Sequence, residues 1–353
     1  MADQRTKITE LVTGLGTLGF ADLDEALAAR PPEMVSMSPE QWCLLDELRR
    51  GGAFGAEFLG AWNNGVAFLA AADGLRGRRP LTIEWRGAQK QPGDEPVPAD
   101  LRIDHVFLVS CKYLSHIVTN TSPTTVFDRL LAGGHGTTPG ATDWYCEVAP
   151  DAYDHLYKAT LHHHLELASE VRGTLPSSPS ADPGGLPGSV HELTAVDREA
   201  LKARLGKGRW PAELRPAAME FSWAVAEASA QRWKQALAGA DLERVLWRLL
   251  RIGSAPYFVL GAAASGSLRL RISTAWDWRQ HFRIDDFAVT PAAREQPVVQ
   301  WTVTVTNRRS LQTCTIEGHV EIRWSHGKFA QRPEAKVYLD TPHHRIPGYW
   351  PLT

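Results

Sequence analysis

Cysteine is scarce in this 353-residue chain, and its four copies show no CxxC spacing. They are Cys43, Cys111, Cys146 and Cys314. This scatter favours neither a zinc site nor a disulfide framework. Apolar runs are short, because no stretch approaches the ~18 residues that a membrane helix needs, and the first residues lack the apolar core of a signal peptide. We therefore expect a cytoplasmic protein with no membrane partner.

Compositional bias is also missing. Hydrophobic residues make up 43% and charged residues 22% of the chain, which excludes wholesale disorder, and the length allows two or three domains. The net charge of −2 conceals an asymmetry, since residues 201–353 carry 22 Lys and Arg against 13 Asp and Glu, whereas residues 1–200 carry 16 against 27. This charge distribution would suit a nucleic acid that contacts both halves of the chain. It would also suit two halves of the protein that attract each other.

The most informative stretch is residues 98–112. Two β-type runs, 101–103 and 106–109, are joined by an Asp-His pair, which predicts two adjacent strands with a tight turn. If the strands pair, Asp100 near the start of the first and Lys112 at the end of the second lie close together at one edge of the sheet. The alternative is that these two residues flank an ordinary hairpin and have no joint role.

This stretch resembles the PD-(D/E)xK nuclease superfamily, whose signature is an Asp on one strand and, after a turn, an acidic-x-Lys on the next. Pro98 and Asp100 fall near the first half of this signature, and Lys112 takes the place of the lysine. Ser110 stands where the family usually carries Glu or Asp. A neutral hydroxyl is a weak ligand for hard cations, so this is a departure from the pattern. The resemblance implies an α/β restriction-endonuclease-like core.

The resemblance also implies a site with one or two Mg²⁺ (or Mn²⁺) ions that activate a water and stabilise charge on the scissile phosphate. Asp100 would hold the metal, Lys112 would assist the attacking water, and Ser110 would orient the water or a ligand. A second carboxylate would come from Glu57, on the preceding predicted helix, or from Glu84, at the end of a predicted strand. The commoner alternative for Glu57 is a solvated helix residue.

Five residues are predicted to contact nucleic acid: Tyr113, His116, Asn120, Arg323 and Lys328. The first three follow directly after the lysine of the motif, where a substrate backbone would pass. The other two belong to an Arg-Trp-Ser-His-Gly-Lys segment that mixes cations with aromatics, as phosphate-and-base contact surfaces do. The alternative for this segment is a solvated strand face with its tryptophan in the core.

Along the chain, five regions are predicted. They are an N-terminal helical arm (1–37), the nuclease-like α/β domain (38–172), a Pro/Gly/Ser-rich linker (173–190), a helical region (191–253) and a β-rich domain with antiparallel strands (254–353). Within the second region, Ser-Pro-Glu-Gln at 38–41 predicts the start of a helix, and Trp144 and Tyr145 predict a short strand.

These observations predict a metal-dependent endonuclease-like protein that acts on DNA rather than RNA, in bacterial defence against foreign DNA. One alternative is a catalytically inactive nucleic-acid-binding or assembly protein on the same fold, in which Ser110 marks the loss of the metal site. Another is an enzyme of a different class, with His and Glu residues that the sequence alone does not group. In the nuclease interpretation, the helical and β-rich regions would serve DNA binding, targeting, or contact with a second copy or a partner protein.

Overall fold

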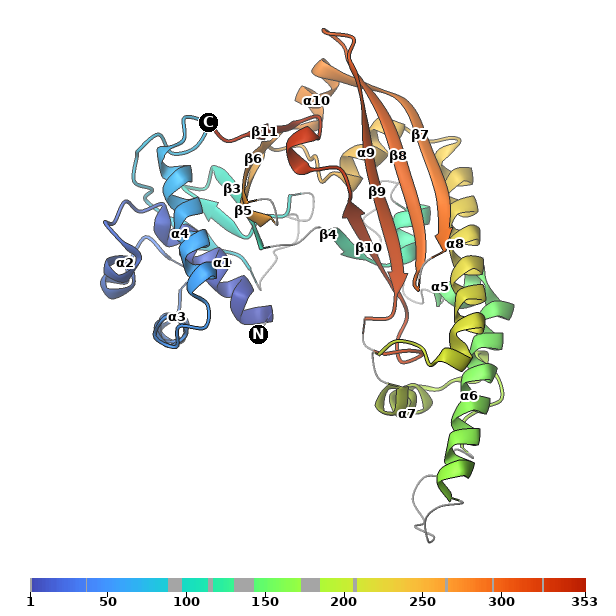
Figure 1. The fold of residues 1–353 in the computed structure, drawn as a ribbon. Coiled ribbons are helices and arrows are strands. Elements are labelled where there is room, and N and C mark those ends of the chain that lie inside the picture. The colour runs from blue at the N-terminus through green and yellow to red at the C-terminus, as the bar shows by residue number, and fades with distance from the viewer. Residues whose placement is uncertain are drawn as a thin grey trace.

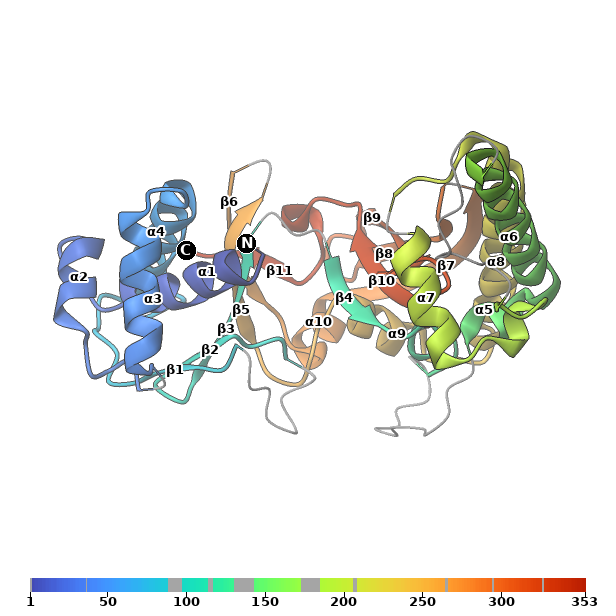
Figure 2. The ribbon, with the colours of Figure 1, turned by 90° about the horizontal axis from the view of Figure 1, so that it is seen from below.

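The computed structural model describes residues 2–35, 37–87, 97–113, 117–129, 143–172, 185–205, 208–263, 266–293, 295–325 and 327–353. They form a mixed α/β fold around two β-sheets (Figure 1). In Figures 1 and 2 the N-terminal helices lie at one end of the molecule, and the long helices that cover the second sheet lie at the other. Across these described residues, no helix combines the length and apolar character that a membrane crossing requires.

The first sheet has six strands in the order β1-β2-β3-β5-β6-β11. Its strands are β1 (Ile83–Trp85), β2 (Leu101–Ile103), β3 (Phe107–Tyr113), β5 (Tyr257–Ala263), β6 (Gly266–Ile272) and β11 (Tyr349–Pro351). Strands β1 to β3 form an antiparallel meander, and β5 pairs with β3 in parallel. β6 and β11 follow antiparallel. The sheet is therefore mixed, with its one parallel pair at the centre.

The predicted hairpin between β2 and β3 is confirmed. The amide of Val106 donates to the carbonyl of Ile103 at 3.1 Å, and the two turn residues, Asp104 and His105, have φ angles of 49° and 58°. Left-handed conformations at both positions are typical of the two-residue turns that match the twist of paired strands. Asp tolerates this conformation because its short side chain can hydrogen-bond locally. The turn therefore fixes the register of the β2–β3 pair.

Helices α1 (Ala2–Gly16) and α4 (Gly55–Ala70) cover one face of the six-stranded sheet. Ile8, Val12 and Leu15 of α1 are fully buried, so the segment predicted as an N-terminal helical arm is helical but belongs to the core. The two helices cross closely, because a Cβ on Gly65 of α4 would lie 2.2 Å from the carbonyl oxygen of Thr13. Helices α2 (Leu23–Ala29) and α3 (Pro39–Arg50) complete this end, and α3 begins with the predicted capping box.

The second sheet is antiparallel and has five strands in the order β4-β10-β9-β8-β7. Its strands are β4 (Ile117–Thr121), β7 (Phe282–Ala293), β8 (Pro297–Asn307), β9 (Thr313–Arg323) and β10 (Glu334–Leu339). Helix α8 (Arg215–Leu237) packs on β7 and β8, and α6 (Pro150–Arg172) packs on α8 (Figures 1 and 2). The alternating sequences of β8 and β9 predicted antiparallel strands, and the sheet confirms this.

Most of the remaining helices follow the sequence pattern. The predicted helical region contains α7 (Ala195–Leu205), α8 and α9 (Leu242–Leu249), and α10 (Ala275–His281) precedes β7. The predicted strand at Trp144 and Tyr145 is wrong, because these residues begin α5 (Trp144–Val148). The Asp143 carboxylate caps this helix by accepting from the amide of Tyr145 at 3.1 Å. Both aromatic side chains are buried, which explains why their apolar character alone suggested a strand.

The strands of the two predicted α/β and β-rich regions are interleaved. β5, β6 and β11, all from residues 254–353, complete the sheet begun by β1 to β3, whereas β4 joins the second sheet. The reason is burial, since Phe258 and Leu260 of β5 share the core under α1 and α4 with Val109 of β3. The structure therefore does not separate at residue 253. Most of the predicted linker, residues 173–184, lies outside the described residues.

Candidate functional site on the six-stranded sheet

Asp100, Ser110 and Lys112 lie on one face of the six-stranded sheet. Leu101 pairs with Val109, so Asp100 lies opposite Ser110, and the hydroxyl of Ser110 donates to Oδ2 of Asp100 at 3.2 Å. Side chains alternate along a strand, which places Lys112, two residues after Ser110, on the same face. The hairpin thus brings together the three residues that the nuclease-like motif predicts. This face is opposite to the one that α1 and α4 cover.

Asp100 also closes the end of the β2–β3 ladder. Its amide donates to the carbonyl of Val109 at 2.8 Å, and its Oδ2 accepts from the amide of Cys111 at 2.7 Å. The carboxylate therefore takes the place of a backbone acceptor beyond the last strand pair. One of its oxygens already receives two hydrogen bonds, from the amide of Cys111 and from the fully buried Ser110.

Glu84 lies on the same face as Asp100 but two residue pairs further along the sheet. It pairs with Arg102, whose guanidinium donates to both carboxylate oxygens at 2.8 and 2.9 Å. His105 Nδ1 lies 2.8 Å from the same carboxylate. The Glu84 carboxylate is thus committed to two basic partners. The position opposite Asp100, just after the end of β1, belongs instead to Arg86, whose amide donates to the Asp100 carbonyl at 2.8 Å.

Glu57 lies on the helix-covered side of the sheet. Its side chain is buried in the first turn of α4 and pairs with Nε of Arg5 from α1 at 3.0 Å. It also contacts Tyr113, whose pKa is raised by burial and by the neighbouring Glu57 carboxylate. Glu57 is therefore not on the Asp100 face, where it was predicted to supply the second carboxylate for a metal. The apolar stripe of α4 faces the sheet, and this directs Glu57 toward α1.

The three carboxylates proposed as metal ligands are not gathered. Within the described residues, no group of three or more His, Cys, Asp or Glu side chains could hold a metal ion. Mg²⁺ prefers several charged oxygens in near-octahedral geometry, and Asp100 supplies one carboxylate whose Oδ2 is already hydrogen-bonded. The residues present do not fit the predicted magnesium cage of Asp100, Glu57 and Glu84.

Gly261 of β5 is a site neighbour that the sequence alone did not identify. It pairs with Lys112, and a Cβ built on it would lie 2.0 Å from the carbonyl oxygen of Lys112. The parallel strand can approach the site at this point only because the residue has no side chain. A glycine inside a strand pattern was the available signal. Its partner, Lys112, lies far away in the sequence, however, so the sequence did not show which strand the glycine approaches.

The predicted nucleic-acid contacts do not form one surface. Tyr113 ends β3 in the first sheet, and His116 lies outside the described residues. Asn120 is exposed on β4 of the second sheet, where its amide donates to Glu334 at 3.3 Å. Arg323 ends β9 and lies 3.4 Å from Glu321.

Lys328 follows β9 at the same end of the second sheet. Its ammonium lies over the ring of Trp210, 4.3 Å from the ring centre, and donates to the carbonyl of Gly208 at 2.6 Å. Arg323 and Lys328 are close in sequence, and both of these predicted contacts lie at the five-stranded sheet. They are on a different sheet from Asp100.

Comparison of this chain with protein-family models, with curated proteins and with solved structures gave no match. The functional interpretation therefore rests on the residues of the site and on the sheet that positions them.

Proposed function

We propose that this chain binds nucleic acid through the Asp100 face of a restriction-endonuclease-like sheet. The observation that carries the proposal is the hydrogen bond from Ser110 to Asp100, which aligns β2 and β3 so that Asp100 and Lys112 share one face. Arg86 occupies the neighbouring position on the β1 side. Two cations beside one hydrogen-bonded carboxylate make a surface suited to phosphate groups. The helix-and-meander order with a parallel fourth strand supports the nuclease-like core.

Metal-dependent cleavage of DNA is the second candidate. It is favoured by one observation, the placement of Asp100 and Lys112 on the same face of a mixed sheet. The single carboxylate counts against it, because Ser110 replaces the second acid with a neutral hydroxyl. Either function would suit defence against foreign DNA, and a DNA target would place the chain in the cytoplasm.

The binding proposal is tested with fluorescent 30-mer duplex DNA, single-stranded DNA and RNA, titrated by anisotropy at several salt concentrations. We expect Lys112→Ala to weaken binding to every sequence and to lower the slope of log affinity against log salt by about 0.9. Arg309→Ala is the control, because Arg309 is an exposed cation in the turn between β8 and β9. Equal losses in both variants, or no binding at low salt, would contradict the proposal.

Cleavage is tested on supercoiled plasmid with Mg²⁺, Mn²⁺ or EDTA. Asp100→Asn is the appropriate variant, because its amide oxygen still accepts from Ser110 and from the Cys111 amide and so preserves the β2–β3 ladder. Metal-dependent cutting that both Asp100→Asn and Lys112→Met lose would establish the nuclease. DNA binding without cutting would support the first proposal alone.

A further inference from the structure

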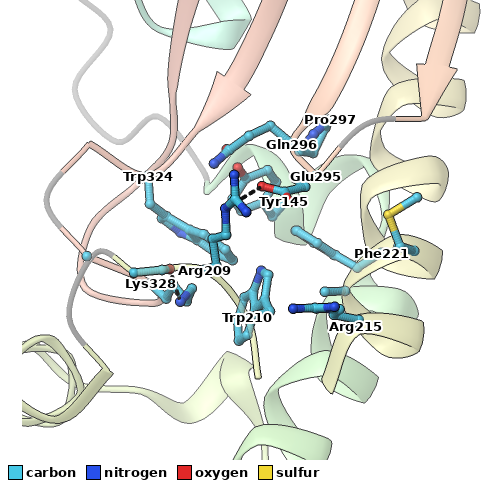
Figure 3. Close-up of a pocket in the computed structure, with 14 residues that line it drawn as sticks. Tyr145, Arg209, Trp210, Arg215, Phe221, Glu295, Gln296, Pro297, Trp324 and Lys328 are labelled. Carbon is cyan, nitrogen blue, oxygen red and sulfur yellow. Dashed lines mark hydrogen bonds and ion pairs between the residues drawn. The ribbon is translucent and has the colours of Figure 1, made fainter. Parts of the chain in front are cut away.

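A pocket of about 410 Å³ opens at one end of the five-stranded sheet (Figure 3). It lies between the first turns of α8, the segment that precedes α8, the turn between β7 and β8, and the turn that follows β9. Its volume falls within the range of about 300–1,000 Å³ that small-molecule sites occupy. The pocket shares no residue with the Asp100 face, so an inference about it does not depend on the proposed function.

Aromatic side chains form the apolar part of the pocket. Trp324 stacks against Phe221 with ring centres 5.7 Å apart and an interplanar angle of 10°. Tyr145 meets Trp324 edge-on at 4.9 Å, and the hydroxyl of Tyr145 is anchored by donating to a backbone carbonyl at 3.1 Å. Trp210 stands beside Trp324, at 6.4 Å between ring centres. This packing holds the rings in fixed positions. Less side-chain motion is therefore lost when a ligand binds, and the entropic cost of binding is lower.

Cations gather at the rim of the same pocket. Arg209, Arg215 and Lys328 contribute three positive charges against one carboxylate, that of Glu295. The one ion pair among these four is weak, because Arg209 and Glu295 are both highly exposed and lie 3.9 Å apart. Arg215 has no ion pair in the described part of the chain. Burial lowers the pKa of Lys328, so its ammonium would gain from a bound anion.

These features specify a ligand with a flat ring system and a negative charge. Aromatic side chains bind a base by stacking, as in proteins that bind single strands. Arginine binds phosphate with its planar fork of donors, and lysine binds it as a point charge. A simple apolar ligand would leave the cations unused, and inorganic phosphate would leave the aromatic wall unused.

We propose that this pocket binds a nucleotide, whose base packs against Trp210 and Trp324 and whose phosphate meets Arg215 or Lys328. The nucleotide could come from two sources that share this chemistry: a free mononucleotide, or one unpaired nucleotide of a single strand. In Figure 3 Lys328 and Arg215 lie on either side of Trp210, so a base on this ring would have a cation on each side for its phosphate.

The test titrates the full chain with the four common nucleoside monophosphates and triphosphates, with the matching nucleosides, with inorganic phosphate and with a (dT)10 oligonucleotide, by isothermal calorimetry. We expect saturable binding of at least one nucleotide, with the nucleoside and phosphate alone at least about tenfold weaker. Binding of mononucleotides identifies the free ligand as the source. Binding of (dT)10 alone, lost in the pocket variants, identifies the strand.

Two matched pairs of variants keep the test specific. Trp210→Leu should weaken binding at least about tenfold, whereas Trp223→Leu, an exposed tryptophan of α8 outside the pocket, should not. Arg215→Gln should also weaken nucleotide binding at least about tenfold. Lys234→Gln, which changes an exposed cation on the same helix, should not. No saturable binding of any nucleotide or of (dT)10 would overturn the proposal. Equal losses in the pocket and control variants would also overturn it.

Discussion

Ser110 and Asp100 are joined across β2 and β3 by a hydrogen bond of 3.2 Å, and Ser110 is fully shielded from solvent. The serine therefore gives Asp100 a donor at the position where the nuclease pattern usually places a second carboxylate. A second acid here would meet Asp100 as a like charge. A neutral hydroxyl stabilises the ionised Asp100 without help from a metal.

Ser110→Asp should consequently destabilise the protein in EDTA, by roughly 2 kcal/mol or more, because a second negative charge would be buried against Asp100. Mg²⁺ or Mn²⁺ should restore much of this loss by bridging the two carboxylates. Thermal unfolding with and without metal measures both effects. Ser110→Asn is the neutral control of similar size, and its melting temperature should not respond to metal. A Ser110→Asp protein as stable as the wild type in EDTA would contradict the predicted repulsion.

Gly65→Ala and Gly60→Ala should change stability in opposite directions, although both glycines lie on α4. A Cβ on Gly65 would meet the Thr13 carbonyl at 2.2 Å, so this variant must push α1 away, at a cost of about 1–3 kcal/mol. A Cβ on Gly60 would meet nothing within 4 Å, so alanine there should stabilise the helix by roughly 0.5–1 kcal/mol. Urea unfolding compares the two. Equal effects would mean that α1 does not pack closely on α4.

Asp104 should make the stability of the β2–β3 turn sensitive to acid. Burial opposes its ionisation, but the ion pair with Arg78 and hydrogen bonds from the Thr82 and Leu81 amides lower its pKa below the usual value. A lowered pKa in the folded state adds stability that is present above about pH 4 and is lost as the pH falls below it.

Asp104→Asn is the variant that tests this, because its amide keeps the acceptor for the two backbone amides and removes the charge. We expect a loss of roughly 1 kcal/mol at pH 7, since Arg78 is more than half exposed and its ion pair is screened. The difference from the wild type should shrink toward pH 3. Unfolding free energies measured from pH 7 to pH 3 check this, and a constant difference across that range would refute it.

Gly261→Ala should loosen the parallel pairing at Lys112. The new methyl group would overlap the Lys112 carbonyl at 2.0 Å, which we expect to cost about 1–3 kcal/mol and to weaken nucleic-acid binding together with stability. Gly239→Ala, where the added Cβ meets nothing within 4 Å, is the control. Wild-type binding by a stably folded Gly261→Ala protein would show that the backbone at Lys112 does not position the site.

Local signals in the sequence predicted local structure well. The turn at Asp104 and His105 and the capping box at Ser38 each depend on a few neighbouring residues, so the chain chemistry at those positions was sufficient. The hairpin in turn placed Asp100 and Lys112 on one face, which is the part of the site that sequence reasoning obtained.

Long-range pairing was the part that the sequence did not reveal. The partner of β3 is β5, and Val109 and Phe258 are separated by almost 150 residues. An apolar run such as that of β5 does not show which strand of a sheet it will pair with. Glu57 illustrates the same limit, because helical spacing placed it beside an apolar stripe but could not show that Arg5 would pair with it.

The central position of β5 has a consequence for synthesis on the ribosome. At about 5–20 residues per second, several seconds or more separate the emergence of β3 from that of its parallel neighbour. During that interval the Lys112 edge of the meander has no strand beside it, and β11, at residues 349–351, joins the sheet later still. A nascent chain therefore cannot complete the sheet around the Asp100 face early, and any activity of this surface is withheld until β5 has been made.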